Sequence, residues 1–272
     1  MADGSKIEWT DATWNPVRGC SMAKGSELGG CLNCYAARYA VRGLQRDSSG
    51  KPFAIMRDSG PRWTGKVELV ESTINRPLFW RKPRRIFVNS QSDLFHESLS
   101  FEEIDRVFTV MVAADWHTYQ ILTKRPERML AYFGSGRHDG GYGPDRLDYH
   151  MEQNIWLGVS VEDFPTWDAR VHLLKSAPAE KRFVSYEPAL ADLGYVDMGG
   201  LDWVIVGGES GPGARPFDVQ WARNTIDQCK EAGVACFVKQ LGAFYGSTLN
   251  NDKKGGDWSL WPEYLRVREF PA

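Results

Sequence analysis

The chain has 272 residues, with 33 Lys and Arg against 35 Asp and Glu and a formal net charge of −2. This length suits one α/β domain, and the near-neutral charge excludes a protein that gathers nucleic acid through an overall cationic field. The N-terminus has no apolar stretch and nowhere do eighteen apolar residues run together, so we predict a cytoplasmic protein without a membrane span.

Short apolar runs rich in β-branched residues alternate along the chain with segments of helical period. Most of these runs are continuously apolar, which is typical of parallel strands buried on both faces. The pattern predicts an α/β fold with a TIM-like barrel of parallel strands, complete or partly open, and a doubly wound open sheet is the alternative. The eight predicted strands are residues 13–17, 66–70, 85–89, 118–123, 155–160, 182–186, 202–207 and 235–240.

Helix boundaries are marked between these runs. Ser100 and Glu103 form a capping-box pattern, and Asp218 and Gly233 have the residue types that begin and end a helix. Thr166 is the predicted cap of another helix, and a further helix is expected directly after Cys34, closing at Gly43. We predict one domain over residues 1–272, with insertions near 45–64 and 134–150 and a C-terminal tail at 243–272.

Three of the five cysteines, Cys20, Cys31 and Cys34, fall within fifteen residues after the first predicted strand. Three thiolates can hold a 4Fe-4S cluster and leave one iron open to a ligand. Zinc is an alternative, although a closed zinc site takes four ligands and the next histidine is His96. Ordinary buried or disulfide-bonded cysteines are the third interpretation, and Cys229 and Cys236 are predicted to be core residues.

Polar residues follow six of the predicted strands at their C-terminal ends. In a barrel of parallel strands the active site forms at this edge, so we expect these residues to share a pocket with the cysteines. The cationic group Lys124, Arg125 and Arg128 is interpreted as a solvated helix end, in preference to a nucleic-acid groove. The strand-end groups are residues 89–93, 123–125, Ser160 with Glu162, 185–187, 207–210 and 239–240.

The chain resembles a bacterial and phage family of unknown function, the phage Gp37/Gp68-like proteins (DUF5131). The resemblance spans nearly the whole chain and includes Trp14-Asn15-Pro16-Val17-Arg18-Gly19-Cys20, Cys31-Leu32-Asn33-Cys34-Tyr35-Ala36, Leu122-Thr123-Lys124-Arg125-Pro126 and Trp203-Val204-Ile205-Val206-Gly207-Gly208-Glu209. That family in turn resembles divergent radical S-adenosylmethionine enzymes.

The second resemblance implies that Cys20, Cys31 and Cys34 hold a 4Fe-4S cluster whose fourth iron takes the amine and carboxylate of S-adenosylmethionine. Ten residues separate the first two cysteines, where that superfamily usually has three, and Gly207-Gly208-Glu209 follows the seventh predicted strand instead of the second. We therefore predict that several residues at strand ends bind S-adenosylmethionine and that Tyr35 lies near its adenine. The predicted cofactor-binding residues are Tyr35, Ser90, Ser92, Asp93, Glu187 and Glu209, and the predicted catalytic residues are Glu187 and Lys124.

The function implied is that of a radical enzyme that abstracts hydrogen from a small molecule or a nucleotide, with a nucleobase or a base within DNA as further substrates. It would need a reducing electron donor, and the sequence does not predict an oligomeric state. One alternative is a hydrolase in which Glu162, Glu187 and Glu209 supply paired carboxylates and the metal site is structural. Another is a zinc-stabilised module that binds nucleic acid.

Overall fold

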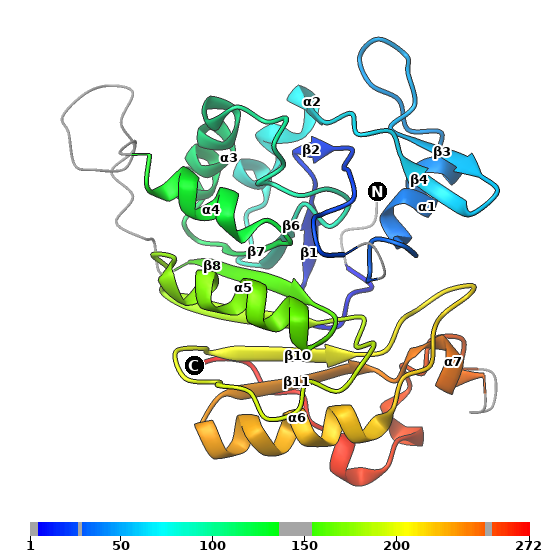
Figure 1. The fold of residues 1–272 in the computed structure, drawn as a ribbon. Helices are drawn as coiled ribbons and strands as arrows, with labels where there is room; N and C mark the ends of the chain where they lie inside the picture. Colours follow the sequence, from blue (N-terminus) through cyan, green and yellow to red (C-terminus); the bar gives the residue numbers. More distant parts are fainter. Residues whose placement is uncertain (1–4, 27–28, 136–153, 248–251) are drawn as a thin grey trace. The chain divides into compact units, whose positions relative to one another are not determined.

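The computed structural model describes residues 5–26, 29–135, 154–247 and 252–272. Seven strands form one sheet in the order β1-β6-β7-β8-β9-β10-β11, and helices alternate with strands along the chain (Figure 1). The β1–β6, β6–β7, β9–β10 and β10–β11 pairs are parallel. The strands are β1 (Ala12–Trp14), β6 (Arg85–Val88), β7 (Thr118–Thr123), β8 (Ile155–Val161), β9 (Lys181–Tyr186), β10 (Trp203–Gly207) and β11 (Ala235–Gln240).

The predicted α/β class with parallel strands is confirmed, whereas a TIM-like barrel is not. The strand order is linear, with β1 and β11 at its ends, and the second predicted strand does not join it. Residues Glu68–Leu69 form β5, which pairs antiparallel with β2 (Val17–Arg18) in a separate small sheet. The alternation of Lys66 and Glu68 with Val67 and Leu69 explains the difference, because a half-buried antiparallel strand has this pattern and a strand buried on both faces does not.

Contacts divide the chain into two compact units. Unit 1 comprises residues 1–23, 36–157 and 176–180, and unit 2 comprises residues 24–35, 158–175 and 181–272. Cys20 therefore belongs to unit 1, and Cys31 and Cys34 belong to unit 2.

Two of the predicted helix starts can be compared directly with the structure. Ser100 caps α3 (Phe101–Ala113) in a complete capping box with Glu103, as predicted. Thr166 does not cap a helix, because α5 (Phe164–Ser176) begins two residues before it. The Asp163 Oδ1 atom accepts a hydrogen bond from the Thr166 backbone at 2.9 Å, and the Thr166 hydroxyl accepts one from the Glu162 backbone at 2.8 Å. Asp163 thus performs the capping that the sequence suggested for Thr166.

The helices predicted after Asp218 and after Cys34 are both present. Asp218 caps α6 (Val219–Ala232), which ends at Gly233 in the left-handed conformation. The helix predicted after Cys34 is α1 (Tyr35–Arg42), which ends before Gly43. The remaining helical elements are α2 (Glu71–Ile74), η1 (Arg76–Phe79), α4 (Pro126–Phe133), α7 (Gly242–Gly246), η2 (Trp258–Leu260) and η3 (Glu263–Leu265).

The structure describes the first predicted insertion and most of the tail, but little of the second insertion. Residues 45–64 contain a hairpin of β3 (Ala54–Arg57) and β4 (Gly60–Trp63). Most of the second insertion, residues 136–150, lies outside the described residues. The tail packs on β11, since the Val238 backbone donates to Val267 at 2.8 Å and Glu269 donates to Cys236 at 2.8 Å.

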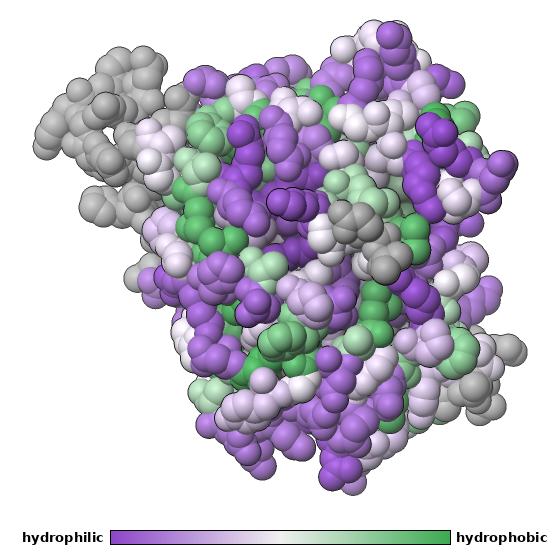
Figure 2. Space-filling model, in the orientation of Figure 1, coloured by the Kyte–Doolittle hydropathy of each residue, from purple (hydrophilic) through white to green (hydrophobic). Residues whose placement is uncertain are grey.

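Among the described residues, no helix has the length and apolar character needed to cross a membrane. Figure 2 shows one face of the molecule, on which hydrophilic residues predominate and hydrophobic residues form small groups.

Candidate functional site

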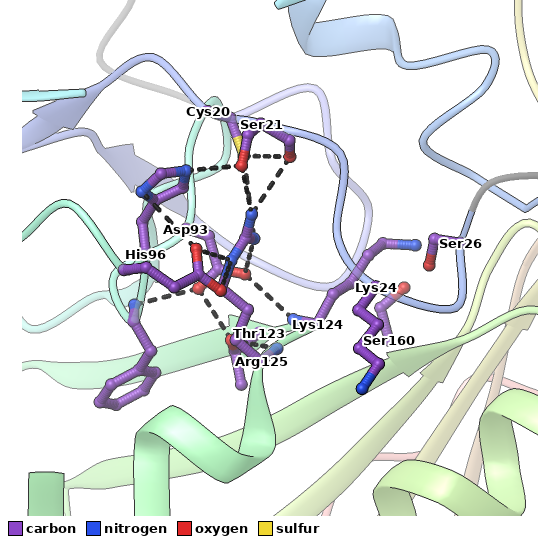
Figure 3. Close-up of polar contacts among 12 residues, drawn as sticks. Cys20, Ser21, Lys24, Ser26, Asp93, His96, Thr123, Lys124, Arg125 and Ser160 are labelled. Atoms are coloured by element: carbon purple, nitrogen blue, oxygen red, sulfur yellow. Dashed lines mark hydrogen bonds and ion pairs between the residues drawn. The ribbon is translucent and has the colours of Figure 1, made fainter. Parts of the chain in front are cut away.

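In unit 1, the buried Asp93 joins the polypeptide that follows β6 to the residues at the end of β7. Its Oδ1 atom accepts hydrogen bonds from the Thr123 hydroxyl at 2.7 Å and from the Phe95 backbone at 3.0 Å. Its Oδ2 atom accepts from the Lys124 backbone and from Arg125 Nη1, each at 3.1 Å (Figure 3). Both carboxylate oxygens are therefore committed to protein donors, so this predicted cofactor ligand already organises the strand ends.

Arg125 is the cation at the centre of this group, which we call the Arg125 cluster: Cys20, Ser21, Asp93, His96, Glu97, Thr123 and Arg125. Its side chain is only 6% exposed. The Nε atom donates to the Glu97 carboxylate at 2.9 and 3.0 Å, and Nη2 donates to the Ser21 hydroxyl at 2.9 Å and carbonyl at 3.2 Å. Nη1, which is bonded to Asp93, also lies 4.0 Å from Cys20 Sγ.

The charge of Arg125 is secured by its surroundings. Burial alone lowers the pKa of Arg125, but the negative charges of Asp93, Cys20 and Glu97 outweigh it and raise the pKa. The interpretation of Arg125 as part of a solvated helix end is thus wrong. The sequence marks Arg125 only as one member of a cationic group, because the partners that bury it lie 28 to 105 residues away in the chain.

His96 is a second hydrogen-bond partner of the Ser21 hydroxyl, beside Arg125. The His96 Nε2 atom lies 2.8 Å from the Ser21 hydroxyl, and Nδ1 accepts a hydrogen bond from the Ser98 backbone at 3.1 Å. Burial lowers the pKa of His96, and the nearby positive charge of Arg125 lowers it further. A neutral ring whose Nδ1 accepts a hydrogen bond carries its proton on Nε2, so we assign Ser21 as the acceptor of that proton.

Ser90 and Ser92, two predicted cofactor ligands, bond to the segment that leads from β1 to Cys20. The Ser90 hydroxyl donates to Asn15 Oδ1 at 3.2 Å, and the Ser92 hydroxyl donates to the Val17 carbonyl at 2.9 Å. Gly19 adopts a φ of +84°, and a Cβ atom at this position would lie 2.0 Å from the Lys66 carbonyl oxygen. Only glycine fits this approach, so the chain enters Cys20 along a fixed path.

In unit 2, a buried ion pair holds the segment between Cys20 and Cys31. The Arg170 Nη1 atom lies 3.1 Å from Glu162 Oε2, with the two side chains 4% and 0% exposed. Arg170 Nη2 donates to the Ser26 hydroxyl at 2.6 Å and to the Lys24 carbonyl at 3.3 Å. Glu162 Oε1 accepts from the Gly30 backbone at 3.3 Å. The pair thus connects β8 and α5 to the residues on the N-terminal side of Cys31.

A second pair, Glu209 with Arg215, holds the same segment. Arg215 donates to both carboxylate oxygens of Glu209, at 2.6 and 3.0 Å, and to the Gly29 carbonyl at 3.1 Å. Burial raises the pKa of Glu209, but hydrogen bonds from Arg215 and from the Asn33 side chain outweigh it and lower the pKa. Glu209, a predicted cofactor-binding residue, is therefore ionised and paired with a protein cation.

Glu187 and Lys239 form a third pair in unit 2, in which the Lys239 ammonium donates to the Glu187 carboxylate. Tyr35 lies in the same neighbourhood. Although 54% of its surface is exposed, burial of the hydroxyl raises the pKa of Tyr35, and the negative charges of Cys34 and Glu187 raise it further. Cys34 and Glu187 thus both lie close enough to act on Tyr35, and Lys239 contacts Glu187, while the pocket predicted for these residues stays a prediction.

All five cysteines lie in described residues, and none is part of a disulfide. Cys229 and Cys236 are buried, which confirms the prediction that they are core residues, while Cys20, Cys31 and Cys34 are partly exposed. Within the described ranges, no three His, Cys, Asp or Glu side chains form a group that could hold a metal ion. The metal-ligand role of the three cysteines stays a prediction.

A family model with the description "Protein of unknown function (DUF5131)" matches residues 4–260 of the chain. No curated protein and no solved structure matches it.

Proposed function

The chain belongs to the DUF5131 family of proteins of unknown function, and we propose that it is an iron–sulfur enzyme of the radical S-adenosylmethionine type. The observation that carries the proposal is the position of Cys20 Sγ, 4.0 Å from the buried guanidinium of Arg125. A thiolate ligand of an iron–sulfur cluster is negatively charged, and a permanent cation beside it compensates that charge.

The donor chemistry of the cysteines fits such a cluster. Cys20, Cys31 and Cys34 are thiols outside disulfides, and each lies in a segment that hydrogen bonds or ion pairs hold in place. Three thiolates are one fewer than a 4Fe-4S cluster with only protein ligands requires, which leaves one iron for a small-molecule ligand. A closed zinc site would need a fourth protein ligand.

A bound cluster of this type would supply one electron that cleaves the sulfonium of S-adenosylmethionine, releasing methionine and a 5′-deoxyadenosyl radical that abstracts hydrogen from the substrate. The chain's own residues would bind and orient the reactants. Glu187 is the carboxylate that we assign to the cofactor's ammonium group, because it lies near Tyr35, the residue that follows Cys34. Tyr35, with its exposed ring surface, is the proposed partner of the adenine.

Glu209 and Asp93 are less suited to binding the cofactor, because protein donors bond to both carboxylate oxygens of each, whereas Lys239 donates to Oε1 of Glu187. They act instead on the segments that carry the cysteines. Lys124, whose backbone is fixed by Asp93, remains with Glu187 a proposed catalytic residue. We keep a small molecule, a nucleotide or a base within DNA as the substrate and a low-potential reductant as the electron donor, as expected from the sequence.

The ion pairs argue against the hydrolase alternative. A glycosidase acid must keep its proton near neutral pH, which requires a raised pKa. Glu162 and Glu187 are held in ion pairs with Arg170 and Lys239, and Glu209 is paired with Arg215, a cation that favours the ionised form of that carboxyl. The pKa of Glu209 is in fact lowered.

The proposed function is tested first by metal content after anaerobic purification and reconstitution with iron and sulfide. We expect about four irons and four sulfides per chain in the wild-type protein, and loss of both when Cys20, Cys31 or Cys34 is changed to Ala. Cys229→Ala is the matched control, since it removes a buried thiol elsewhere. Equal iron in the wild-type protein and Cys34→Ala, or stoichiometric zinc without sulfide, would refute the cluster.

A loaded and reduced protein then tests the cofactor. Adding S-adenosylmethionine should change the electron paramagnetic resonance signal of the cluster, because the cofactor's amine and carboxylate would bind iron directly. Slow formation of 5′-deoxyadenosine and methionine should follow. A fully loaded protein that gives neither result would leave the cluster as a structural element.

A further inference from the structure

We propose that Arg125 is a positioning residue for the Cys20 sulfur: its guanidinium fixes the Cys20–Ser21 segment and stabilises negative charge on Cys20 Sγ. The part of this inference that concerns an iron–sulfur cluster rests on the function proposed above. The part that concerns the order of the Cys20–Ser21 segment does not, because the contacts involved are made by the protein alone.

Arg125 donates hydrogen bonds to both the backbone and the side chain of Ser21, the residue next to Cys20. Nη2 donates to the Ser21 carbonyl at 3.2 Å and to its hydroxyl at 2.9 Å, while His96 contacts the same hydroxyl at 2.8 Å. Figure 3 shows the guanidinium directed toward Cys20 and Ser21 from the end of β7. A planar fork with fixed donors holds such a geometry better than a flexible ammonium group does.

Arg125 is itself held in place by two carboxylates. Asp93, 5% exposed, binds Nη1, and Glu97 binds Nε with both of its carboxylate oxygens. Asp93 is held in turn by Thr123 and by two backbone N–H groups. A surface arginine would lose side-chain entropy on reaching toward a sulfur, whereas this arginine has already been ordered by its other partners.

The electrostatic consequence follows from the position of Nη1. A cation and an N–H donor near a cysteine sulfur stabilise the more negative state of any cluster that the sulfur binds, and so raise the reduction potential. Arg125→Lys alters the N–H donor but keeps a positive charge near the sulfur, whereas Arg125→Gln removes the guanidinium and its charge. We therefore expect Arg125→Lys to lower the reduction potential of the cluster less than Arg125→Gln does.

Arg128 provides the matched control, in the helix α4 that begins directly after Arg125. It is also a partly buried arginine, but it donates to the Leu99 carbonyl and lies over the Phe101 ring, 4.6 Å from the ring centroid. Arg128→Gln removes the same charge from unit 1 without touching Cys20 or Ser21.

The first experiment measures hydrogen exchange of the segment Gly19–Ala23 in the metal-free protein. We expect exchange there to be at least about tenfold faster in Arg125→Gln than in the wild-type protein, and unchanged in Arg128→Gln. Ser21→Ala keeps the Arg125–Asp93 pair and should accelerate hydrogen exchange of this segment less than Arg125→Gln does. It replaces Arg125→Gln as the test variant if that protein does not fold. Equal rates in the wild-type protein and Ser21→Ala, or complete exchange of the wild-type segment at the earliest time, would overturn the positioning role.

The second experiment measures the midpoint potential of the reconstituted cluster by a reductive titration followed by electron paramagnetic resonance. We expect Arg125→Gln to shift the one-electron equilibrium about tenfold toward the oxidised state, or about 59 mV to lower potential, with a smaller shift in Arg125→Lys. Arg128→Gln should shift it less than either variant. Equal shifts in Arg125→Gln and Arg128→Gln would show a general charge effect and overturn the contact with Cys20 as the cause.

The failures of the two proposals can be told apart. A wild-type protein that binds no iron refutes the proposed function, and hydrogen exchange still decides whether Arg125 orders the Cys20 segment. A wild-type protein that binds iron, with potentials that Arg125→Gln leaves unchanged, supports the proposed function and overturns this inference.

Discussion

Arg125 of unit 1 and Arg170 of unit 2 are both buried arginines that hold a segment next to a cysteine, but their partners differ. Arg170 pairs with Glu162, which is 0% exposed, and it also donates to the Ser160 and Lys24 carbonyls and to the Ser26 hydroxyl. Arg125 pairs with buried Asp93 and with Glu97, whose side chain is 63% exposed, and it also approaches a sulfur.

We infer from this difference that Arg170 serves mainly to stabilise the fold, whereas Arg125 also acts on the Cys20 sulfur, the proposed cluster ligand. A fully buried pair must be complete, because loss of one partner leaves a charge without compensation. Arg125 shares its charge among two carboxylates and Cys20, and one of those carboxylates can also be solvated by water. We therefore expect changes around Arg170 to affect stability most, and changes at the exposed side of Arg125 to affect it least.

The largest effect on stability should come from Arg170→Met. The substitution removes the Arg170 cation from buried Glu162 and releases Ser26 and Lys24, so we expect a loss of about 3–5 kcal/mol in the free energy of unfolding. Urea denaturation measures the loss. Lys175→Ala in the same helix is the control, since the Lys175–Asp197 pair is exposed and should shift the midpoint much less. Equal shifts in both variants would contradict the distinction between the two kinds of pair.

A pair of glycine substitutions compares the approaches to the cysteines in the two units. In Gly19→Ala the new Cβ atom meets the Lys66 carbonyl at 2.0 Å with φ at +84°, whereas in Gly29→Ala it lies 3.2 Å from the Glu162 carboxyl carbon. We expect about 2–4 kcal/mol of destabilisation for Gly19→Ala from left-handed strain and overpacking, and less for Gly29→Ala. Thermal unfolding and iron content of both variants measure the difference, and a reversed order would show that the Gly29 side is the more constrained.

The Glu209–Arg215 pair should make the stability of the protein depend on pH. The pKa of Glu209 is lowered below its ordinary value of 4.5, so this carboxylate stabilises the folded state above that pH and loses its contribution as the pH falls through its folded-state pKa. Glu209→Gln should therefore be less stable than the wild-type protein at neutral pH, and the difference should shrink below pH 4.5. Urea unfolding across this range measures it, and a difference independent of pH would mean that packing, not charge, is lost.

The smallest effect is expected for Glu97→Gln. Its side chain is mostly exposed, and an amide oxygen can still accept a hydrogen bond from Arg125, so we expect a change below about 1 kcal/mol. Asp93→Asn is the contrasting variant, because Asp93 is buried and accepts four hydrogen bonds. A larger loss in Glu97→Gln than in Asp93→Asn would contradict the account of the Arg125 cluster.

Local sequence patterns predicted much of the fold. The continuous apolar runs at residues 203–207 and 235–240 became neighbouring parallel strands, and the run at 85–88 pairs with β1 and β7 in the same sheet, because a strand buried on both faces has few alternatives. The capping box at Ser100 and the stop at Gly233 act within one turn of a helix, so the sequence alone was sufficient. The error at Thr166 is also local, since Asp163 and Thr166 are both capable caps and only the three-dimensional contacts distinguish them.

Sequence by itself determined the α/β class, the cluster of three cysteines and the polar residues at strand ends, because each depends on residue type and short spacing. Tertiary structure alone decided the partner of each charged group. Glu162, Glu187 and Glu209 look alike as carboxylates after strands, yet each is paired with a cation, on α5, on β11 and in the loop after β10 respectively. From the sequence Arg125 was interpreted as a surface cation, but in the structure it is buried by residues up to 105 positions away in the chain. The free energy of burying a charge depends on those distant partners, and no short stretch of sequence contains them.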